Sequence, residues 1–518
     1  MSTKYTTDRV VSEEIKPTID VEEIINRGNA AKKGAITDTT HSDRAVEILA
    51  TYSGDREWTA EEDKKLVRKI DRRLISILFI TYGIQFYDKS LLSQAALFGL
   101  RQDLNLTAND KYSFSSSIFY IGFIAGTYPA ALMAQRWPIE RVAFGIVLLW
   151  GICLTLTIKC TNYQTLYTQR FFLGLLEAGV SPMFMMIVGS WYKKDEQAFR
   201  IGAWYSATGF VSCLSPLINW GLGHIQGGVL HPWQYMYLVA GCVTIAWAFI
   251  LLFFLPSDPT LARGLTDRER FITISRLVKN NTGVRSTHFK WNEAWELFFD
   301  IKFWILVTIA FLTMITNGPV TTFVPIFISG FGFSQFNSLL LVIPLSFLSG
   351  LGQLLSTFLA AKVPDSRSYI MAFCQIGPIV GALLSWNLPR SEKGGLLFAT
   401  YILVGYASTY AVLMGLQLAN TAGYTKRSLA SAGIFLGYCL GNFVGPMVFR
   451  DSDAPVYQPG FVTVLSCSVS AALLSLLYRF LCVRENRLRD AAGMLEAFDH
   501  AYDDGLTDKK NNQFRYSL

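Results

Sequence analysis

Two pairs of ionisable residues lie inside long apolar stretches of the chain. Arg170 and Glu177 occupy the stretch 165–191, and Asp88 with Lys89 occupies the stretch 74–98. An ionisable group at membrane depth costs a few kcal/mol or more, so such groups persist where they line a cavity, form a pair or bind something. Seven residues are close to two helical turns, so Arg170 and Glu177 project from one face, about 10 Å apart. An acid and a base in this arrangement could hold an anion and move a proton.

The composition indicates a membrane protein built of helices. Of the 518 residues, 51% are hydrophobic and 16% are charged, and the apolar residues form long uncharged windows such as 144–158 and 237–255. In water, helices that are apolar on every side would need an improbably large core. We therefore predict an all-α membrane protein. The net charge of +7 arises from basic residues at segment ends and in alternate loops, so it indicates no nucleic-acid partner.

Chemistry outside the membrane segments has little support in the sequence. The eight cysteines are dispersed without a C-x-x-C pair and fit apolar packing positions. His224 and His231 flank one loop without metal-ligand spacing, and no P-loop or catalytic nucleophile motif occurs. We expect neither an enzyme nor a bound metal or cofactor.

Twelve apolar segments are long enough to cross a hydrocarbon core of about 30 Å. Their even number places both ends of the chain on one side. We expect a tail at 1–73, a six-helix bundle at 74–255, a central loop at 256–302, a second six-helix bundle at 303–483 and a tail at 484–518. The predicted spans are 74–98, 112–134, 141–160, 165–191, 201–223, 233–255, 303–329, 337–361, 368–388, 395–417, 428–449 and 458–482.

Basic residues determine the expected orientation. They are frequent in the central loop, in the tails and in the alternate loops on that side, and sparse in the other loops. Both termini and the central loop are therefore expected in the cytoplasm, and the plasma membrane is the expected location. The sequon at Asn105 then falls in the first external loop, where it is a candidate for glycosylation. In the central loop, 291–299 has the aromatic and acidic mix of a helix on the membrane surface.

The helical rise per residue places Asp88 and Arg170 at similar heights in the membrane. Asp88 lies about 21 Å and Arg170 about 22 Å from the inner face, and Glu177 lies about 10 Å deeper, near the midplane. These groups have two interpretations: an internal Asp–Arg or Glu–Arg ion pair that joins helices, or a site for an anion and a proton. We favour the site, because apolar contacts serve a scaffold equally well.

Other polar residues in apolar segments give weaker signals. Asn317-Gly318-Pro319, followed by Pro325, predicts a broken helix that could act as a gate. Tyr120 and Tyr128 could supply hydroxyl groups, although packing is an ordinary role for tyrosine. Four amides of the second half could face a cavity or bridge helices, namely Gln353, Gln417, Asn420 and Asn442.

The whole pattern resembles a known family. Six plus six spans about a long loop are typical of the major facilitator superfamily, and within it the chain is most similar to the anion:cation symporter family, in particular its fungal allantoate permease group. The resemblance covers about 73–484 and excludes the tails. The motifs that carry it are YDKS at 87–90, AALFGL at 95–100, YIGF at 120–123, YPA at 128–130, RFFLGLLEAG at 170–179 and WYKKDEQ at 191–197, with Arg200 after it.

The resemblance implies roles for individual residues. Glu177 and Asp88 match acids that couple transport to protons, and Arg170 matches an arginine that stabilises the anion or the acid. Lys89 matches a residue that contacts the substrate carboxylate, where many relatives have Arg, so the bidentate contact is lost here. We add Tyr120 as a further substrate-binding candidate.

Three more residues complete the candidate set. Asn442 is a second additional substrate-binding candidate, and Pro319 is a gating candidate in the predicted helix break. Arg136 is the other gating candidate. It follows Gln135 where the family usually has Asp-Arg, so one partner of the expected gating ion pair is missing.

The expected function is a proton-coupled importer of a small organic anion, with two bundles that rock about a midplane site. Glu177 would take up a proton outside, Lys89 and Arg170 would hold the anion, and release of the proton inside would reset the carrier. The resemblance leaves the cargo open among allantoate, ureidosuccinate, nicotinate, pantothenate, biotin, sulfur-containing amino acids and small peptides. A nutrient receptor that binds without transport and a facilitator without proton coupling remain alternatives. The expected partners are the anion, protons and the lipid bilayer, for a monomeric chain.

Overall fold

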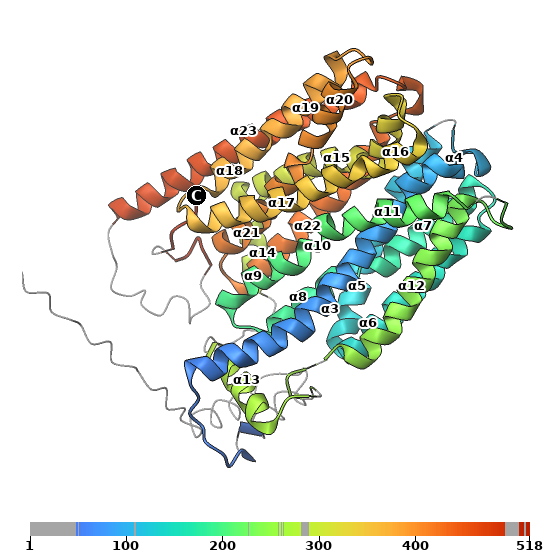
Figure 1. Ribbon diagram of the computed structural model, residues 1–518. Coiled ribbons are helices and arrows are strands. Elements are labelled where there is room, and N and C mark those ends of the chain that lie inside the picture. The colour runs from blue at the N-terminus through green and yellow to red at the C-terminus, as the bar shows by residue number, and fades with distance from the viewer. Residues whose placement is uncertain are drawn as a thin grey trace, which may run out of the picture.

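The computed structural model describes residues 48–49, 51–107, 110–225, 227–256, 258–260, 262, 264–280, 290–492, 507–511 and 514–518, and the regular elements in these residues are all helices (Figure 1). The first half contains α3 (Ala60–Ala95), η1 (Ala96–Phe98), α4 (Leu100–Asp103), α5 (Lys111–Arg136), α6 (Ile139–Leu156), η2 (Thr157–Lys159), α7 (Tyr163–Glu177), α8 (Val180–Trp191), α9 (Lys194–Tyr205), α10 (Ala207–Phe210), η3 (Val211–Cys213), α11 (Leu214–Gly223) and α12 (Pro232–Phe254).

The second half follows a connecting segment that holds α13 (Asp267–Asn280) and α14 (Trp291–Phe298). Its elements are α15 (Ile301–Gly330), α16 (Gln335–Leu340), α17 (Val342–Lys362), α18 (Arg367–Cys374), α19 (Ile376–Asn387), α20 (Lys393–Ile402), α21 (Gly405–Asn420), α22 (Tyr424–Met447), η4 (Asp451–Asp453) and α23 (Gln458–Ala491).

The membrane-spanning helices agree with the sequence prediction. Within the described residues, eleven helical stretches are long and apolar enough to cross a membrane. The other predicted span, 74–98, lies in α3 and η1. Because α3 has 36 residues, it measures about 54 Å and exceeds the ~30 Å hydrocarbon core. The second half of α3 carries polar residues, among them Gln85, Asp88 and Lys89, so α3 is less apolar than the eleven other membrane-spanning stretches. The prediction of an all-α membrane protein is confirmed.

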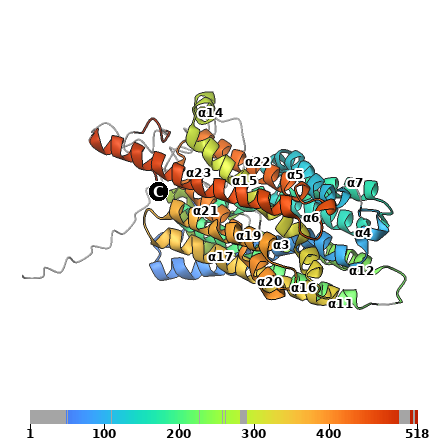
Figure 2. The same cartoon turned by 90° about the horizontal axis from the view of Figure 1, so that it is seen from above.

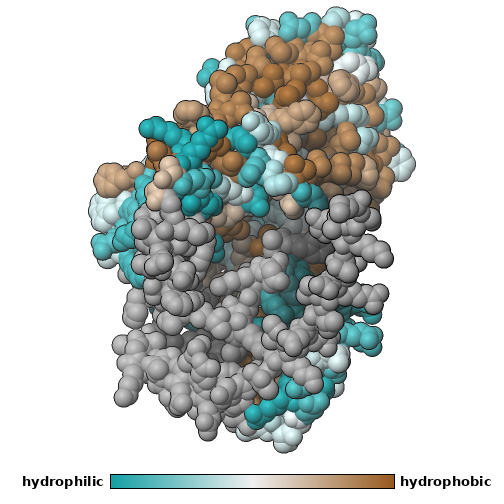
Figure 3. All heavy atoms as spheres, turned by 90° about the vertical axis from the view of Figure 1, so that its left-hand side faces the viewer, coloured by the Kyte–Doolittle hydropathy of each residue, from teal (hydrophilic) through white to brown (hydrophobic). Residues whose placement is uncertain are grey.

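The two described ends of the helical region lie on one side of the molecule. α3 begins and α23 ends on this side, which we call the terminal face, and α4 and α16 lie at the opposite face (Figure 1). Seen toward the terminal face, hydrophobic residues cover the upper part of the molecule, and hydrophilic residues lie below them (Figure 3). α23 also carries large exposed apolar side chains, among them Phe480 and Leu473, as expected of a lipid-facing helix.

α14 stands at the edge of the molecule beside α22 (Figure 2). Its ring side chains Trp291, Trp295 and Phe298 are exposed, whereas Glu293 is buried and accepts hydrogen bonds from the backbone N–H groups of Thr425 and the residue after it, at 3.0 and 3.2 Å. The carboxylate therefore caps the start of α22, and the aromatic side has the form of a helix at a membrane surface.

Glycines bring α5 and α7 into close backbone contact, and this contact positions Arg170. A Cβ at Gly122 of α5 would collide with the carbonyl oxygen of Phe171, and a Cβ at Gly174 of α7 would collide with that of Phe119. Only a residue without a side chain permits such an approach. The motif residues around Arg170 are thus pressed against the middle of α5.

The predicted break at Asn317-Gly318-Pro319 is wrong. α15 continues from Ile301 to Gly330 with Pro319 and Pro325 inside it. Gly318 lies against Gly445 and Pro446 of α22, so the small residues serve close packing of two helices. Packing against α22 keeps α15 continuous, although proline by itself favours a helix end.

A helix irregularity occurs instead in the fourth span, directly after Glu177. α7 ends at Glu177 and α8 begins at Val180, and Ala178 and Gly179 between them keep right-handed helical dihedral angles. The sequence prediction of one continuous span at 165–191 did not include this interruption. An interrupted helix leaves backbone groups for other partners.

Contacts between the two halves include a cluster of hydrogen bonds toward the opposite face. Tyr112 donates to the carbonyl oxygen of Thr322 at 2.8 Å, and the hydroxyls of Ser116 and Thr322 lie 2.8 Å apart. Ser113 donates to the carbonyl oxygen of Phe449 at 2.9 Å. The first turns of α5 therefore bind the last turns of α15 and α22.

Each half has its own ion-pair network at the terminal face. In the first half, Arg276 of α13 pairs with Asp63 of α3 and with Glu196 of α9. In the second half, Lys426 pairs with Glu296 and Asp300, among other acids. Among the described residues, no ion pair joins the two halves, so these networks fasten each half separately.

The described C-terminal residues, 507–511 and 514–518, pack against the terminal face of the second half. Asp508 pairs with the buried Lys426 at 2.7 Å, and the ammonium of Lys302 lies 3.5 Å from the ring centroid of Tyr516. Tyr516 also exchanges backbone hydrogen bonds with the side chain of Asn486. Burial and the neighbouring Asp508 raise the pKa of the Tyr516 hydroxyl. The predicted tail from 484 thus starts inside α23 and, at 507–511 and 514–518, contacts the bundle.

We predict that Gly122→Ala destabilises the protein and that Gly145→Ala does not. The new methyl group at Gly122 meets a backbone carbonyl, and overpacking of this kind costs about 1–3 kcal/mol. Gly145 of α6 has nothing within 4 Å of the added Cβ, so the better helix propensity of alanine should leave stability equal or higher. Thermal unfolding of the purified protein measures both, and equal melting temperatures would contradict the close contact.

We predict that Asp508→Asn lowers the apparent melting temperature by several degrees. The change removes a charge that is 2% exposed and pairs with Lys426, and loss of a buried charged hydrogen bond costs about 1–3 kcal/mol. Glu61→Gln is the matched control, because its pair with Lys65 is largely exposed and contributes little. A control that is as destabilised as Asp508→Asn would show that the pair of Asp508 with Lys426 adds no specific stability.

Candidate functional site

The predicted ionisable residues gather in the first half, but they do not form ion pairs with one another. Among the described residues, no carboxylate oxygen lies within 4.0 Å of the Lys89 ammonium or of the Arg170 guanidinium, whereas seventeen other close ion pairs are present. The Asp–Arg and Glu–Arg pairs considered from the sequence are therefore absent from this conformation. Two cations are left without a counter-ion in a region shielded from water.

Glu177 is fully buried at the end of α7. Gln85 of α3 donates through its amide nitrogen to the Glu177 carboxylate oxygen Oε2 and to the Glu177 carbonyl oxygen, both at 3.3 Å. The other carboxylate oxygen, Oε1, has no hydrogen-bond partner. The helix interruption after Glu177 thus gives Gln85 access to both the backbone and the side chain of one residue.

Asp88 and Lys89 are adjacent in sequence and face different surroundings. Asp88 is fully buried, and its Oδ2 accepts a hydrogen bond of 3.0 Å from Thr244 of α12, while Oδ1 has no partner. Lys89 is half-buried and faces α5 and α22. Successive helical residues differ by about 100° in direction, so one residue faces the interior of the first half and the next faces the second half.

Arg170 is held by weak contacts. Its Nε donates to the carbonyl oxygen of Ser115 at 3.4 Å, and its guanidinium lies 5.4 Å from the ring centroid of Phe119. Nη1 is buried and has no partner. Since the Lys89 ammonium lies 5.2 Å from the same Phe119 ring, both cations contact one aromatic side chain.

Aromatic rings surround the Lys89 ammonium. Its nitrogen also lies 4.8 Å from the ring centroid of Tyr120 and 3.5 Å from the hydroxyl of Tyr438 on α22. The sequence identified Tyr120 alone of this group. The full set of rings within 6 Å is Phe86 at 5.6 Å, Phe119 at 5.2 Å, Tyr120 at 4.8 Å, Phe123 at 5.9 Å and Tyr438 at 5.8 Å.

Asn442 belongs to a hydrogen-bonded chain inside the second half. Its Oδ1 accepts from Asn317 at 2.6 Å, and its Nδ2 donates to the carbonyl oxygen of Tyr438 at 2.9 Å. The hydroxyl of Tyr406 donates to Asn317 at 2.6 Å. Asn442 is therefore connected to the lysine environment through the backbone of Tyr438, without a contact to Lys89 itself.

The remaining predicted residues lie away from this group. Arg136 is exposed at the end of α5 and makes no hydrogen bond or ion pair with another described residue. Asn105 is exposed near the opposite face with a φ of 53°, in the left-handed region that asparagine tolerates. Pro319 is buried inside α15. None of these three side chains contacts the ionisable group.

Sequence reasoning missed Gln85 and the rings contributed by Phe86, Phe119 and Tyr438. Three of these residues are close in sequence to predicted ones, and their spacing could have identified them. Gln85 and Phe86 precede Lys89 by four and three residues on the same helix, and Phe119 precedes Tyr120. Tyr438 lies on a distant helix, and its place beside Lys89 follows only from the packing of the two halves.

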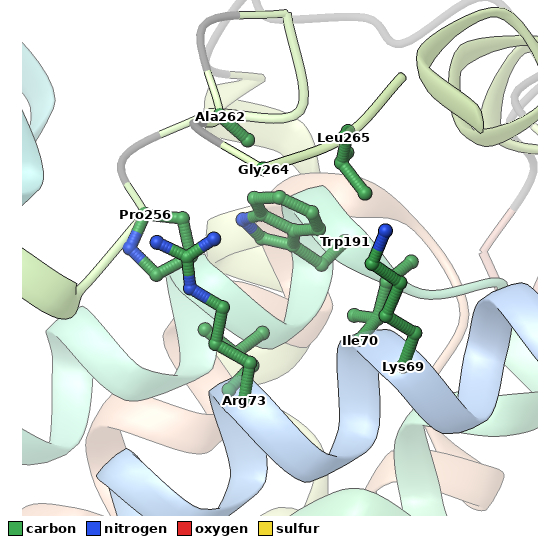
Figure 4. Close-up of a pocket in the computed structure, with 9 residues that line it drawn as sticks. Lys69, Ile70, Arg73, Trp191, Pro256, Ala262, Gly264 and Leu265 are labelled. Carbon is green, nitrogen blue, oxygen red and sulfur yellow. The ribbon is translucent and has the colours of Figure 1, made fainter. Parts of the chain in front are cut away.

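A small pocket at the terminal face is separate from the candidate site. It lies between α3, the end of α8 and the segment after α12, with Lys69 and Arg73 beside the indole of Trp191 (Figure 4). Lys69 already pairs with Glu269 at 2.7 Å. Lys89 lies sixteen residues beyond Arg73 on α3, about 24 Å along the helix. This pocket is therefore not part of the candidate site.

Comparison with known proteins identifies the architecture. The sequence profile of the Major Facilitator Superfamily matches residues 78–446. An uncharacterised transporter of Schizosaccharomyces pombe is 34% identical over 480 residues, which cover 92% of this chain and 89% of that protein. The allantoate permease of Saccharomyces cerevisiae is 29% identical over 487 residues, with 91% and 89% covered. The thiamine pathway transporter THI73 of the same yeast is 29% identical over 471 residues, with 91% and 89% covered.

Solved structures agree on the fold. A D-xylose–proton symporter superposes with a TM-score of 0.61 at 14% identity, covering 78% of this chain and 97% of that one. The xylose transporter XylE of E. coli superposes with a TM-score of 0.58 at 14% identity, with 80% and 98% covered. At such identities the likeness establishes the arrangement of the helices alone.

We predict that Thr244→Val destabilises the protein through the loss of its hydrogen bond to Asp88. An unsatisfied buried polar group costs about 1–3 kcal/mol, so the melting temperature should fall. In an Asp88→Leu background the same Thr244→Val change should have little effect, because the partner is gone. Equal effects of Thr244→Val in both backgrounds would mean that the two side chains do not interact.

Proposed function

The chain belongs to the Major Facilitator Superfamily and is a secondary transporter, and on that premise we propose that it is a proton-coupled symporter that imports a small organic anion by alternating access. The observation that carries the proposal is a pair of cations, the half-buried Lys89 and the buried Arg170, that have no carboxylate in contact and lie in the same half as the buried acid Glu177. We propose the plasma membrane as its location, with both termini and the central loop in the cytoplasm.

The unpaired cations favour an anionic cargo. A positive charge removed from water is unfavourable unless a negative charge compensates it. In this conformation Lys89 and Arg170 have only ring faces, one hydroxyl and one backbone carbonyl. A bound carboxylate would supply the missing charge between them. The name of the related allantoate permease is consistent with an organic anion as cargo.

Glu177 is the proposed proton carrier. Its carboxylate has one amide donor, Gln85, and one oxygen without a partner, so a proton on that oxygen would break no hydrogen bond. Protonation of Glu177 leaves both nearby cations available to the anion. Loss of the proton restores a negative charge that competes with the anion for them. Binding of the anion and uptake of the proton are therefore coupled through the shared cations.

The distribution of contacts supports movement of two halves about this site. Hydrogen bonds such as that of Tyr112 with Thr322 join the halves toward the opposite face, and the ion-pair networks of the terminal face stay within each half. With the terminal face in the cytoplasm, this is an inward-facing arrangement. The outward-facing arrangement would break the hydrogen bonds of the opposite face and bring the terminal ends of the halves together.

We predict that Glu177→Gln retains exchange of the anion across the membrane and loses accumulation driven by a proton gradient. Glutamine keeps the shape and the hydrogen bond to Gln85 but cannot carry a proton. Uptake of radiolabelled small organic anions, allantoate among them, is measured at about pH 5 and about pH 7.5 with and without a protonophore, and accumulation should fall about tenfold or more. Glu392→Gln, an exposed acid at the start of α20, should behave like the unchanged protein.

Two results would contradict the proposal. Accumulation by Glu177→Gln that still rises in acid would exclude Glu177 as the proton carrier. Saturable binding of an anion without uptake by the unchanged protein at the cell surface would favour a receptor on the same fold.

A further inference from the structure

We infer that the anion carried by this protein is a planar, unsaturated carboxylate, which pairs with Lys89 and stacks on the aromatic rings that line the contact between the two halves. The inference rests on the proposed function, since it specifies the cargo of the same site. It follows from the surroundings of the Lys89 ammonium and from the arrangement of the rings.

The first observation is that ring faces take the place of a counter-ion. The Lys89 ammonium lies within 6 Å of five ring centroids and within 4.0 Å of no carboxylate oxygen of the described residues. Aromatic rings attract a cation through the negative charge of their faces. This environment holds the ammonium in place without a carboxylate in direct contact, so an incoming carboxylate displaces no ion-pair partner from Lys89.

The second observation is that the rings come from both halves and lie at the middle of their helices. Phe123 of α5 lies 5.6 Å from Phe435 of α22, and Tyr120 lies 6.3 Å from Tyr438, measured between ring centroids. Phe435 and Tyr438 are nearly parallel, at 5.9 Å and an interplanar angle of 13°. Two adjacent parallel rings on one half thus face two rings on the other.

This arrangement of rings favours the binding of a planar cargo. In this conformation the facing rings of the two halves contact one another directly. As the halves separate, a planar ring that enters between them would replace these contacts on both sides, whereas a saturated ring of equal size would not. Stacked and edge-to-face aromatic pairs are favoured beyond the area that they bury. Because the cargo then contacts Tyr120 and Tyr438 at once, its presence is sensed by both halves, as alternating access requires.

The positive charge of the site favours an aromatic anion over an aromatic cation as the cargo. Lys89 and Arg170 both contact the ring of Phe119, and neither has a counter-ion among the described residues. A positively charged ring placed among these aromatic side chains would meet both cations. A negatively charged ring satisfies the charge and the ring faces together.

The test compares two acids of equal charge and equal carbon count, benzoate and cyclohexanecarboxylate. Their dissociation constants for the purified full chain in lipid nanodiscs are measured by calorimetry near pH 7.5, where both acids are ionised. We expect benzoate to bind about threefold to tenfold more tightly. Lys89→Gln should weaken binding of both acids by a similar factor.

Variants of the ring residues test whether these rings cause the preference for benzoate. Tyr438→Leu and Phe435→Leu should each bring the two dissociation constants within about twofold of one another. Tyr438→Phe retains the ring and should retain the preference. Phe398→Leu is the control, because this side chain is exposed on α20, and it should bind both acids like the unchanged protein.

Equal affinity for both acids in the unchanged protein would overturn the inference and leave the organic-anion proposal standing. A preference for benzoate that survives both leucine variants would also overturn it, because the rings would not be its source. Binding of neither acid by a chain that unfolds cooperatively would count against the inference and against an anion site at Lys89 alike.

Discussion

Buried positive charge without an internal counter-ion is the constraint on which this structure depends. Lys89 and Arg170 lie at membrane depth, where a cation is unfavourable, and the protein holds them with the ring of Phe119, a hydroxyl and a backbone carbonyl. An ion pair with Asp88 or Glu177 would have stabilised them more strongly. It would also have used the charges that the proposed anion needs. The absence of such pairs among the described residues is what the proposed site depends on.

The surrounding fold supports these charges by close packing. Gly122 and Gly174 let α5 and α7 touch through their backbones, and this contact brings Phe119 and Arg170 together. The interruption after Glu177 frees a carbonyl that Gln85 satisfies together with the carboxylate. Rigid packing and one irregular turn are thus combined in the same span. The two features give the acid a fixed position and an incomplete set of partners.

The contacts between the halves differ from those within each half. The terminal-face ion pairs of Arg276 and of Asp508 each stay within one half, so the proposed change of conformation would leave them intact. The hydrogen bonds toward the opposite face join serines and tyrosine to backbone carbonyls, which are modest interactions that water can replace. The rings around Lys89 lie between these two levels. They meet at the contact between the halves, where the proposed cargo would touch both.

The sequence by itself determined the spans and the helical class, and its motifs resembled the superfamily that the profile match then established. Hydropathy over twenty residues is a local property, and a motif such as that at 170–179 is contiguous, so both are readable without a structure. The sequence also located Lys89, Arg170 and Glu177, because a charge inside an apolar segment is visible in one dimension.

Only the tertiary structure decided which way each charge faces and what it meets. Asp88 faces α12 and Lys89 faces α22, although the two are neighbours in sequence. The helix break expected at Pro319 does not occur, because packing against α22 keeps α15 continuous. The interruption lies after Glu177 instead, where Gln85 of α3 donates a hydrogen bond to the carbonyl oxygen of Glu177. Tyr438 joins Lys89 across 349 residues of chain. Long-range packing carries no local signature, so these contacts follow from the folded chain alone.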